Sequence, residues 1–322
     1  MIVFKSASKA FRASLLHLRT CGDIVESSSD PDSPGSNFGT KKRLTRQIIG
    51  YNLKIGDPRD RLINVVGRHT NPIFAMANAL WITGGRNDLD FIEYYNARGK
   101  NFSNDGETLY GAYGSRLASG CTINQIDSGI IDRLKKDPFT RRAFATIVQP
   151  RDTTSHSRDI PCLLSIQFHR NKEGLDMVST MRSQSAAMVM PYDIFALTFF
   201  HETIATLLGL PLGTYHHDSG SFHYYMEEEP VVDEILKGQH FGKSTLPEII
   251  PKMPTEAIWD RVDRVMELET YIRTGTLRPA DLLKEPLPDY WKGILFLLGV
   301  QTWGKQEDVL SRVPEYYRNA LT

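Results

Sequence analysis

The chain has 322 residues, of which 41% are hydrophobic and 24% are charged, the proportions of an ordinary soluble globular protein. Its 38 Lys and Arg residues balance 38 Asp and Glu residues, so no overall field recruits nucleic acid or an anionic membrane, and any anion site must be a local cluster. Three cysteines without a disulfide or zinc spacing suit a reducing compartment, and no apolar run reaches the roughly 20 residues that cross a bilayer. We therefore expect a cytoplasmic protein.

The N-terminal residues predict a strand at 2–5 and then a helix with Phe11, Leu15, Leu16 and Leu18 on its buried side. The first 22 residues carry basic residues and no acid, which also fits a transit peptide, but the apolar spacing favours part of the fold. Residues 27–40 are rich in Ser, Pro, Gly and Asp and predict a mobile loop.

Further elements follow in chain order from period and punctuation. We expect strands at 48–55, 62–66, 143–149, 163–169 and 175–181, and helices at 72–82, 126–136 and 192–208. The last helix is apolar nearly all round, which indicates a central position, and Gly209 is its natural stop. Residues 245–322 are rich in helical patterns.

The stretch around Cys162 is the strongest chemical signal. Pro161-Cys162 opens a strand in which apolar and polar residues alternate, and Arg182 follows the next strand. A thiol near an arginine has a favoured anion, and the anion is the nucleophile. By residue type alone, however, a buried and inert cysteine is the commoner case.

Several motifs occur in one order between residues 72 and 225. They are Asn78-Ala79-Leu80-Trp81 with Gly84-Gly85, Tyr113-Gly114, Asp137-Pro138-Phe139-Thr140-Arg141-Arg142, Pro161-Cys162 with Gln167-Phe168, Arg182-Ser183 with Pro191-Tyr192-Asp193, and Gly220-Ser221-Phe222-His223-Tyr224-Tyr225. Together they resemble the thymidylate synthase superfamily, most closely its (deoxy)cytidylate 5-hydroxymethylase branch. The resemblance implies an α/β (α+β) fold, in which a mixed β-sheet with flanking helices packs against its twin in a homodimer. We expect residues 1–244 to form this catalytic domain and residues 245–322 a helical extension packed on it.

The resemblance also implies roles for single residues. Cys162 would add to C6 of the pyrimidine ring of a nucleoside monophosphate, so that C5 can attack a one-carbon electrophile. The residues that would bind the nucleotide are Arg182, Ser183, Gln167, His223 and Tyr225 of one chain, with Arg141 and Arg142 reaching across from the partner chain. One of Lys41, Lys42 and Arg43 could also close on the phosphate.

Asp193 is an informative departure, because methylating members of the family have Asn there. An amide pairs with O4 and N3–H of uracil, whereas a carboxyl group accepts from the 4-amino group of cytosine and stabilises a protonated N3. A mismatch leaves buried polar groups unpaired, so this residue predicts a CMP or dCMP 5-hydroxymethylase. Capping of the helix that Pro191 opens is the alternative role.

The folate side departs further from the family. Asn78 replaces a catalytic Glu and cannot act as a general acid or base at neutral pH, which leaves Tyr113 beside it among the catalytic positions. Ser185 replaces the Asp that holds the pterin ring, although Trp81 of the same folate-facing set is kept. We expect 5,10-methylenetetrahydrofolate as the cofactor, in a remodelled site.

Other functions stay open. They are a dUMP methylase of the thymidylate synthase type, cysteine chemistry on a pyrimidine nucleotide without folate, and a nucleotide binder without turnover. A metal-dependent hydrolase using His216, His217, Asp218 and His223 is a further alternative, although their spacing matches no metal signature.

Overall fold

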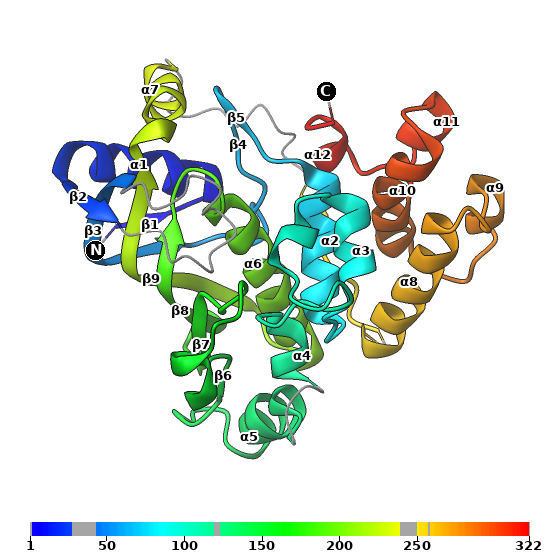
Figure 1. The fold of residues 1–322 in the computed structure, drawn as a ribbon. Helices are drawn as coiled ribbons and strands as arrows, with labels where there is room; N and C mark the ends of the chain where they lie inside the picture. Colours follow the sequence, from blue (N-terminus) through cyan, green and yellow to red (C-terminus); the bar gives the residue numbers. More distant parts are fainter. Residues whose placement is uncertain (1, 28–42, 119–122, 239–249, 257, 322) are drawn as a thin grey trace.

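The computed structural model describes residues 2–27, 43–118, 123–238, 250–256 and 258–321 (Figure 1). The greater part of the predicted loop at 27–40, with Lys41, Lys42 and Cys121, lies outside these ranges. The predicted domain boundary between residues 244 and 245 also lies outside them and remains a proposal.

A seven-stranded mixed sheet organises the first two thirds of the chain. Its strand order is β1-β3-β9-β8-β7-β6, and β2 pairs with β3 at the side. The β1–β3 and β8–β9 pairs are parallel and the others are antiparallel, which confirms the predicted mixed sheet. The strands are β1 (Val3–Phe4), β2 (Asp23–Ser27), β3 (Arg43–Ile55), β6 (Phe144–Thr146), β7 (Leu163–Arg170), β8 (Leu175–Ser185) and β9 (Leu212–Tyr225), and a separate hairpin joins β4 (Asn64–Val65) to β5 (Arg68–His69).

Helices flank this sheet and continue beyond it. They are α1 (Ala7–Cys21), α2 (Pro72–Thr83), α3 (Leu89–Tyr95), α4 (Tyr113–Leu117), α5 (Asp132–Lys136), α6 (Met190–Leu207), α7 (Glu229–Lys237), α8 (Ile258–Arg273), α9 (Pro279–Leu282), α10 (Asp289–Trp303), α11 (Glu307–Leu310) and α12 (Glu315–Arg318). None of the helices in the described ranges is long and apolar enough to cross a membrane.

Helix α6 lies between two hydrophobic clusters, as its apolar circumference predicted (Figure 1). Ile194, Leu197, Phe200 and Ile204 pack in the cluster that contains α1 and the sheet. Phe195, Ala196 and Phe199 pack in the second cluster, which contains α2, α8, α10 and α12. Burial of each large apolar side chain stabilises the fold by about 1.5–3 kcal/mol. The helix is therefore fixed on every side, and residues at its ends hold defined positions.

The C-terminal helices pack on α2 and α6 and not on the sheet (Figure 1). A buried ion pair stands at this junction, where Glu202 of α6 contacts Arg61 and accepts a 2.8 Å hydrogen bond from Nε of Arg59. The backbone N–H of Met253 donates to the same carboxylate at 3.2 Å. The helix-rich prediction for residues 245–322 is confirmed within the described part.

Several predicted elements differ from the observed ones. Leu16 is exposed, because it lies about 100° around the helix from the buried side of Phe11, Leu15 and Leu18. The predicted helix 126–136 begins as a π-helical turn at Gln125–Ile131, and the predicted strands 62–66 and 143–149 shorten to two and three residues. Strand β8 does not end at Met181 but continues through Ser185, so Arg182 and Ser183 lie within it.

Candidate active site

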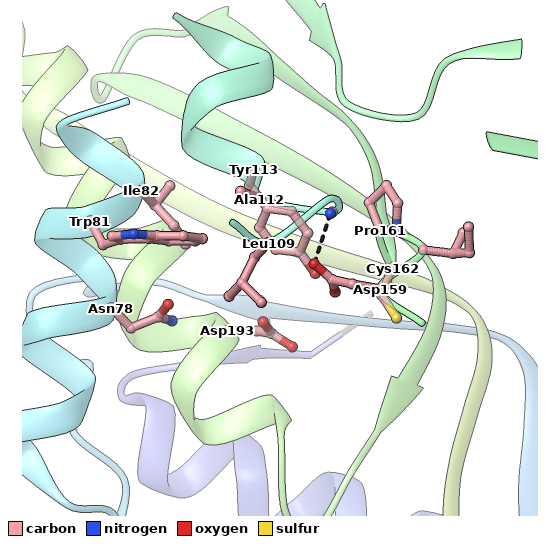
Figure 2. Close-up of a pocket in the computed structure, with 12 residues that line it drawn as sticks. Asn78, Trp81, Ile82, Leu109, Ala112, Tyr113, Asp159, Pro161, Cys162 and Asp193 are labelled. Atoms are coloured by element: carbon pink, nitrogen blue, oxygen red, sulfur yellow. Dashed lines mark hydrogen bonds between the residues drawn. The ribbon is translucent and has the colours of Figure 1, made fainter. Parts of the chain in front are cut away.

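A cavity of about 180 Å³ lies between α2, the first turn of α6 and two loops (Figure 2). It brings together five of the predicted site residues from four separate segments of the chain. These are Asn78 and Trp81 of α2, Tyr113 at the start of α4, Cys162 just before β7, and Asp193 of α6. The remaining lining residues are Ile82, Leu109, Gly111, Ala112, Asp159, Ile160 and Pro161.

Arg182 fixes the loop that carries Cys162. Its backbone N–H donates to the carbonyl of Cys162 at 2.8 Å, its Nε to the carbonyl of Pro161 at 3.0 Å, and its Nη2 to the carbonyl of Ile160 at 3.0 Å. These three bonds join β8 to consecutive residues of the loop. Because the loop is held in this way, the sulfur has one defined place in the cavity wall.

Burial raises the pKa of the Cys162 thiol above its usual value. Arg182 lowers that pKa, as the sequence predicted, but burial outweighs it, and the carboxylates of Asp193 and Asp159 act in the same direction as burial. The expectation of a favoured anion in the free protein is therefore wrong in its net sign. A thiol of this kind needs a proton acceptor, or a ligand that stabilises its anion, before it attacks.

Asp193 has a buried carboxyl group, only 8% exposed, that faces the cavity. Its Oδ2 accepts a 2.8 Å hydrogen bond from Nε2 of Gln184, and no helix amide donates to it among the hydrogen bonds of the described residues. Burial raises the pKa of Asp193 to about 6, and the Gln184 bond opposes that shift. The capping alternative is therefore not the role of this side chain, which serves the cavity.

Asp159 is a cavity residue that the motifs did not single out. Its Oδ2 accepts a 2.7 Å hydrogen bond from the backbone N–H of Gly111 (Figure 2), and burial raises its pKa. A Cβ at Gly111 would lie 2.5 Å from the backbone oxygen of Asp159, so only glycine permits this approach. The available signal was a carboxyl residue three positions before the predicted nucleophile.

The opposite wall of the cavity comes from α2 and α4. Burial raises the pKa of the Tyr113 hydroxyl well above its usual value, and the charges of Asp193 and Cys162 add to this. Trp81 is buried, with its Nε1–H donating to the carbonyl of Asp88 at 3.1 Å. Asn78 therefore faces Asp193 and Cys162 across a wall that is otherwise aromatic and apolar (Figure 2).

The other predicted site residues do not line this cavity. Ser185 and His223 are in register on β8 and β9, and Ser183 is opposite Ser221 on the same pair of strands. Tyr225 lies under the guanidinium of Arg43, which is 3.5 Å from the ring centroid. Gln167 is an exposed residue of β7, and Arg141 and Arg142 are exposed residues between α5 and β6.

Strand geometry separates the histidines considered as metal ligands. His217 of β9 is fully buried, whereas its neighbours His216 and Asp218 alternate to the other face of the sheet. Within the described ranges, no group of three or more His, Cys, Asp or Glu residues is arranged to hold a metal ion.

The thymidylate synthase family model matches residues 18–278, and the chain belongs to this family. The deoxyuridylate hydroxymethyltransferase of Bacillus phage SP01 is 28% identical over 206 residues, which cover 60% of this chain and 54% of that protein. The protein of the same name from Delftia phage PhiW-14 is 31% identical over 198 residues, covering 58% and 54%. A putative thymidylate synthase of Methanosarcina mazei is 30% identical over 128 residues, covering 39% and 58%.

These similarities agree with the predicted family and its hydroxymethylase branch. The chain spans about half the length of the curated phage relatives that it matches. The substrate named for those relatives is deoxyuridylate and not a cytidylate, so the base specificity is argued below from the site itself.

Proposed function

We propose that this protein is a transferase that adds a one-carbon unit to C5 of a pyrimidine nucleoside monophosphate, with CMP or dCMP as the preferred substrate and a 5-hydroxymethyl product. One observation carries the proposal: Cys162 and the buried carboxyl group of Asp193 line the same cavity. A nucleophile for C6 and a hydrogen-bonding group for the far edge of the ring are the two parts that this chemistry needs.

In the proposed reaction, the Cys162 thiolate adds to C6 and the ring electrons move to C5, which becomes a nucleophile. C5 forms a bond to the one-carbon unit and then loses its proton to a base of the cavity. Expulsion of the thiolate restores the C5–C6 double bond, and water provides the hydroxyl group of the product. Asp159 is our candidate for the base, because its pKa is raised and Asn78 cannot take a proton.

Methylenetetrahydrofolate, which the family generally uses, is the proposed one-carbon donor. The wall formed by Trp81, Ile82 and Leu109 fits one face of a flat ring, whereas Ser185 lies outside the cavity. When bound, the cofactor would supply the one-carbon unit as an electrophile. The residues of this chain would hold its ring against Trp81 and keep water from the reacting carbon.

Asp193 supports the cytosine assignment. An ionised carboxylate accepts a hydrogen bond from a 4-amino group, but it would face the 4-oxo group of uracil as a second acceptor. With a pKa of about 6, the carboxylate form predominates at pH 7 and above. Deoxyuridylate is the second candidate substrate, since three similar phage proteins are named for it.

Release of tritium from C5-labelled CMP, dCMP and dUMP tests the proposal, with and without methylenetetrahydrofolate. We expect release from a cytidylate that depends on the folate. Release from dUMP alone would refute the cytosine assignment, and release that ignores folate would favour folate-free cysteine chemistry. No release from any of the three would leave the nucleotide-binder alternative, which equilibrium binding of the same nucleotides would measure.

We further propose that the site is completed by a second copy of the chain. Arg141 and Arg142 are exposed and do not line the cavity of their own chain, which fits phosphate binding in a partner's site beside Arg182 and Ser183. In the same proposal, His223 and Tyr225 bind the sugar and Gln167 lies near the phosphate and base.

Mixing two inactive variants tests this sharing. Cys162→Ala removes the nucleophile, and Arg141→Ala with Arg142→Ala removes the proposed partner contacts. Mixed dimers would contain one site with neither defect, so refolding the two variants together should restore part of the activity. Mixtures that stay as inactive as the separate variants would show that each site is built from one chain.

A further inference from the structure

A chain of buried hydrogen bonds leads away from Asp193 into the sheet. Gln184 of β8 donates from Nε2 to Oδ2 of Asp193 at 2.8 Å, and its Oε1 lies 3.0 Å from Nε2 of His217 on β9. Nδ1 of His217 lies 2.9 Å from the hydroxyl of Tyr215 and 3.2 Å from Oγ of Ser179. Gln184 is 1% exposed, and the other three residues of this chain are fully buried.

The hydrogen bonds of this chain run in one direction. Burial lowers the pKa of His217 to about 4, so its ring is neutral at pH 7 and carries one proton. That proton is on Nε2, because the neighbouring Oε1 of Gln184 can only accept. Nδ1 then accepts from Tyr215, since Ser179 donates to the backbone carbonyl of His216 at 3.3 Å.

The direction fixes the amide of Gln184. With Oε1 engaged by His217, the NH₂ group must face Asp193, and a donor at Oδ2 favours the ionised carboxylate. Turning the amide over would place two acceptors against each other at Asp193 and two donors against each other at His217. No hydrogen bond within the described residues reaches Oδ1, so this oxygen is left for a ligand in the cavity.

Other titratable groups face Asp193 from the elements packed around it. Tyr113 comes from α4, Cys162 from the loop before β7, and Tyr215 from β9, and burial raises the pKa of all three. All three are therefore neutral at pH 7, and Asp159 lies in the same cavity wall. Gln184 is the residue in direct hydrogen-bonding contact with the Asp193 carboxylate.

We propose that Gln184 and His217 are positioning residues that hold Asp193 as a carboxylate with one free oxygen, and that they thereby set the preference for a 4-amino over a 4-oxo pyrimidine nucleotide. The inference rests on the proposed function for its ligand. It adds two residues, on neighbouring strands, that lie outside the cavity and act through Asp193. A neutral Asp193 could donate to a 4-oxo group as well as accept from a 4-amino group, so discrimination would fall with protonation.

The test uses full-length protein and the double variant Gln184→Met with His217→Phe. Replacing both partners with apolar groups of similar shape avoids leaving a buried donor or acceptor unpaired. Tyr215 and Ser179 keep each other as partners at 2.7 Å. Thr198→Val is the matched control, because Thr198 is equally buried on α6 but bonds only to backbone carbonyls of that helix.

Two readouts separate this inference from the proposed function. Carbon-13 NMR of labelled aspartate, assigned with Asp193→Asn, measures the pKa of Asp193 without any substrate. Calorimetric binding of CMP and UMP and of their deoxy forms, between pH 5.5 and pH 8.5, measures base preference. The double variant should raise the pKa of Asp193 by about one unit and reduce the cytidylate preference at pH 7 by up to about tenfold, since one hydrogen bond to a charged group is lost. The control should change neither.

An unchanged Asp193 pKa in the folded double variant would overturn the positioning role. A raised pKa with an unchanged base preference would overturn the link to specificity. Wild-type protein that binds none of the four nucleotides would refute the proposed function instead, and the NMR titration would still decide whether Gln184 and His217 control the charge of Asp193.

Discussion

Helix α6 carries two buried carboxyl groups that differ in everything except burial. Glu202, near its C-terminal end, is 1% exposed and contacts Arg59 and Arg61. Burial opposes its charge, but the two arginines outweigh burial and hold the pKa of Glu202 below its usual value. Asp193, in the first turn, is 8% exposed and has one neutral partner, and burial raises its pKa to about 6.

This contrast separates a structural carboxylate from a functional one. The fold itself compensates the charge of Glu202, which joins α6 to the residues leading into the C-terminal helices. The charge of Asp193 is only partly compensated, and the missing partner would come from a ligand in the cavity. Each of the following predictions breaks or sharpens this difference.

The largest effect is expected for Cys162→Ala, at the Asp193 end. Turnover should fall by on the order of 10³-fold or more, because no other group of the cavity can form the bond to C6. Nucleotide affinity and thermal stability should change little, since the residue lies at a cavity wall. Tritium release and calorimetry on the same preparation check both parts, and full activity in this variant would end the covalent mechanism.

Glu202→Gln should instead affect stability. It leaves the buried Arg61 without its counter-charge, and breaking such a pair typically costs about 3–5 kcal/mol. Because the pKa of Glu202 is lowered in the folded state, its stabilisation is present above the unfolded pKa and is lost as the pH falls through the folded pKa. Urea unfolding at pH 7 measures the loss. A variant as stable as the wild type would show that the pair contributes nothing to the fold.

Asp159→Asn tests a third buried carboxyl group, which faces the same cavity as Asp193. If Asp159 takes the C5 proton, the rate of tritium release should fall by on the order of 10²-fold with little change in KM. The limb of the pH–rate profile that Asp159 causes should disappear as well. A variant with normal turnover and an unchanged profile would reduce Asp159 to its hydrogen bond with Gly111.

Most of the fold could be predicted from the sequence, because apolar period and helix punctuation are local. Helix α2 begins at Pro72 and ends before Gly84, and α6 is apolar on all sides, as expected. The main omission was β9, which lies at the centre of the sheet. Its inward positions include His217 and Ser219 beside Tyr215, so the strand has no simple apolar alternation.

The candidate site was predictable where a residue type carries its own chemistry. Cys162 and Asp193 are of this kind, and they line one cavity. Gln184 and His217 were not predictable as a pair, because only the register of β8 and β9 with the start of α6 brings them to Asp193. The net effect on the Cys162 thiol was also hidden, since it depends on burial and the sequence shows only the neighbouring arginine.

The smallest expected effect is that of Asp193→Asn on stability, and its sign is opposite to that of the Glu202 variant. A carboxyl group whose pKa rises from 3.8 to about 6 on folding destabilises the protein increasingly as the pH rises through that interval. Asparagine keeps an oxygen that can accept from Gln184 and carries no charge. The variant should therefore be more stable than the wild type by about 2–3 kcal/mol at pH 8, and by nearly nothing at pH 4. Thermal unfolding across this range measures the difference, and a difference independent of pH would mean that Asp193 is already compensated as fully as Glu202.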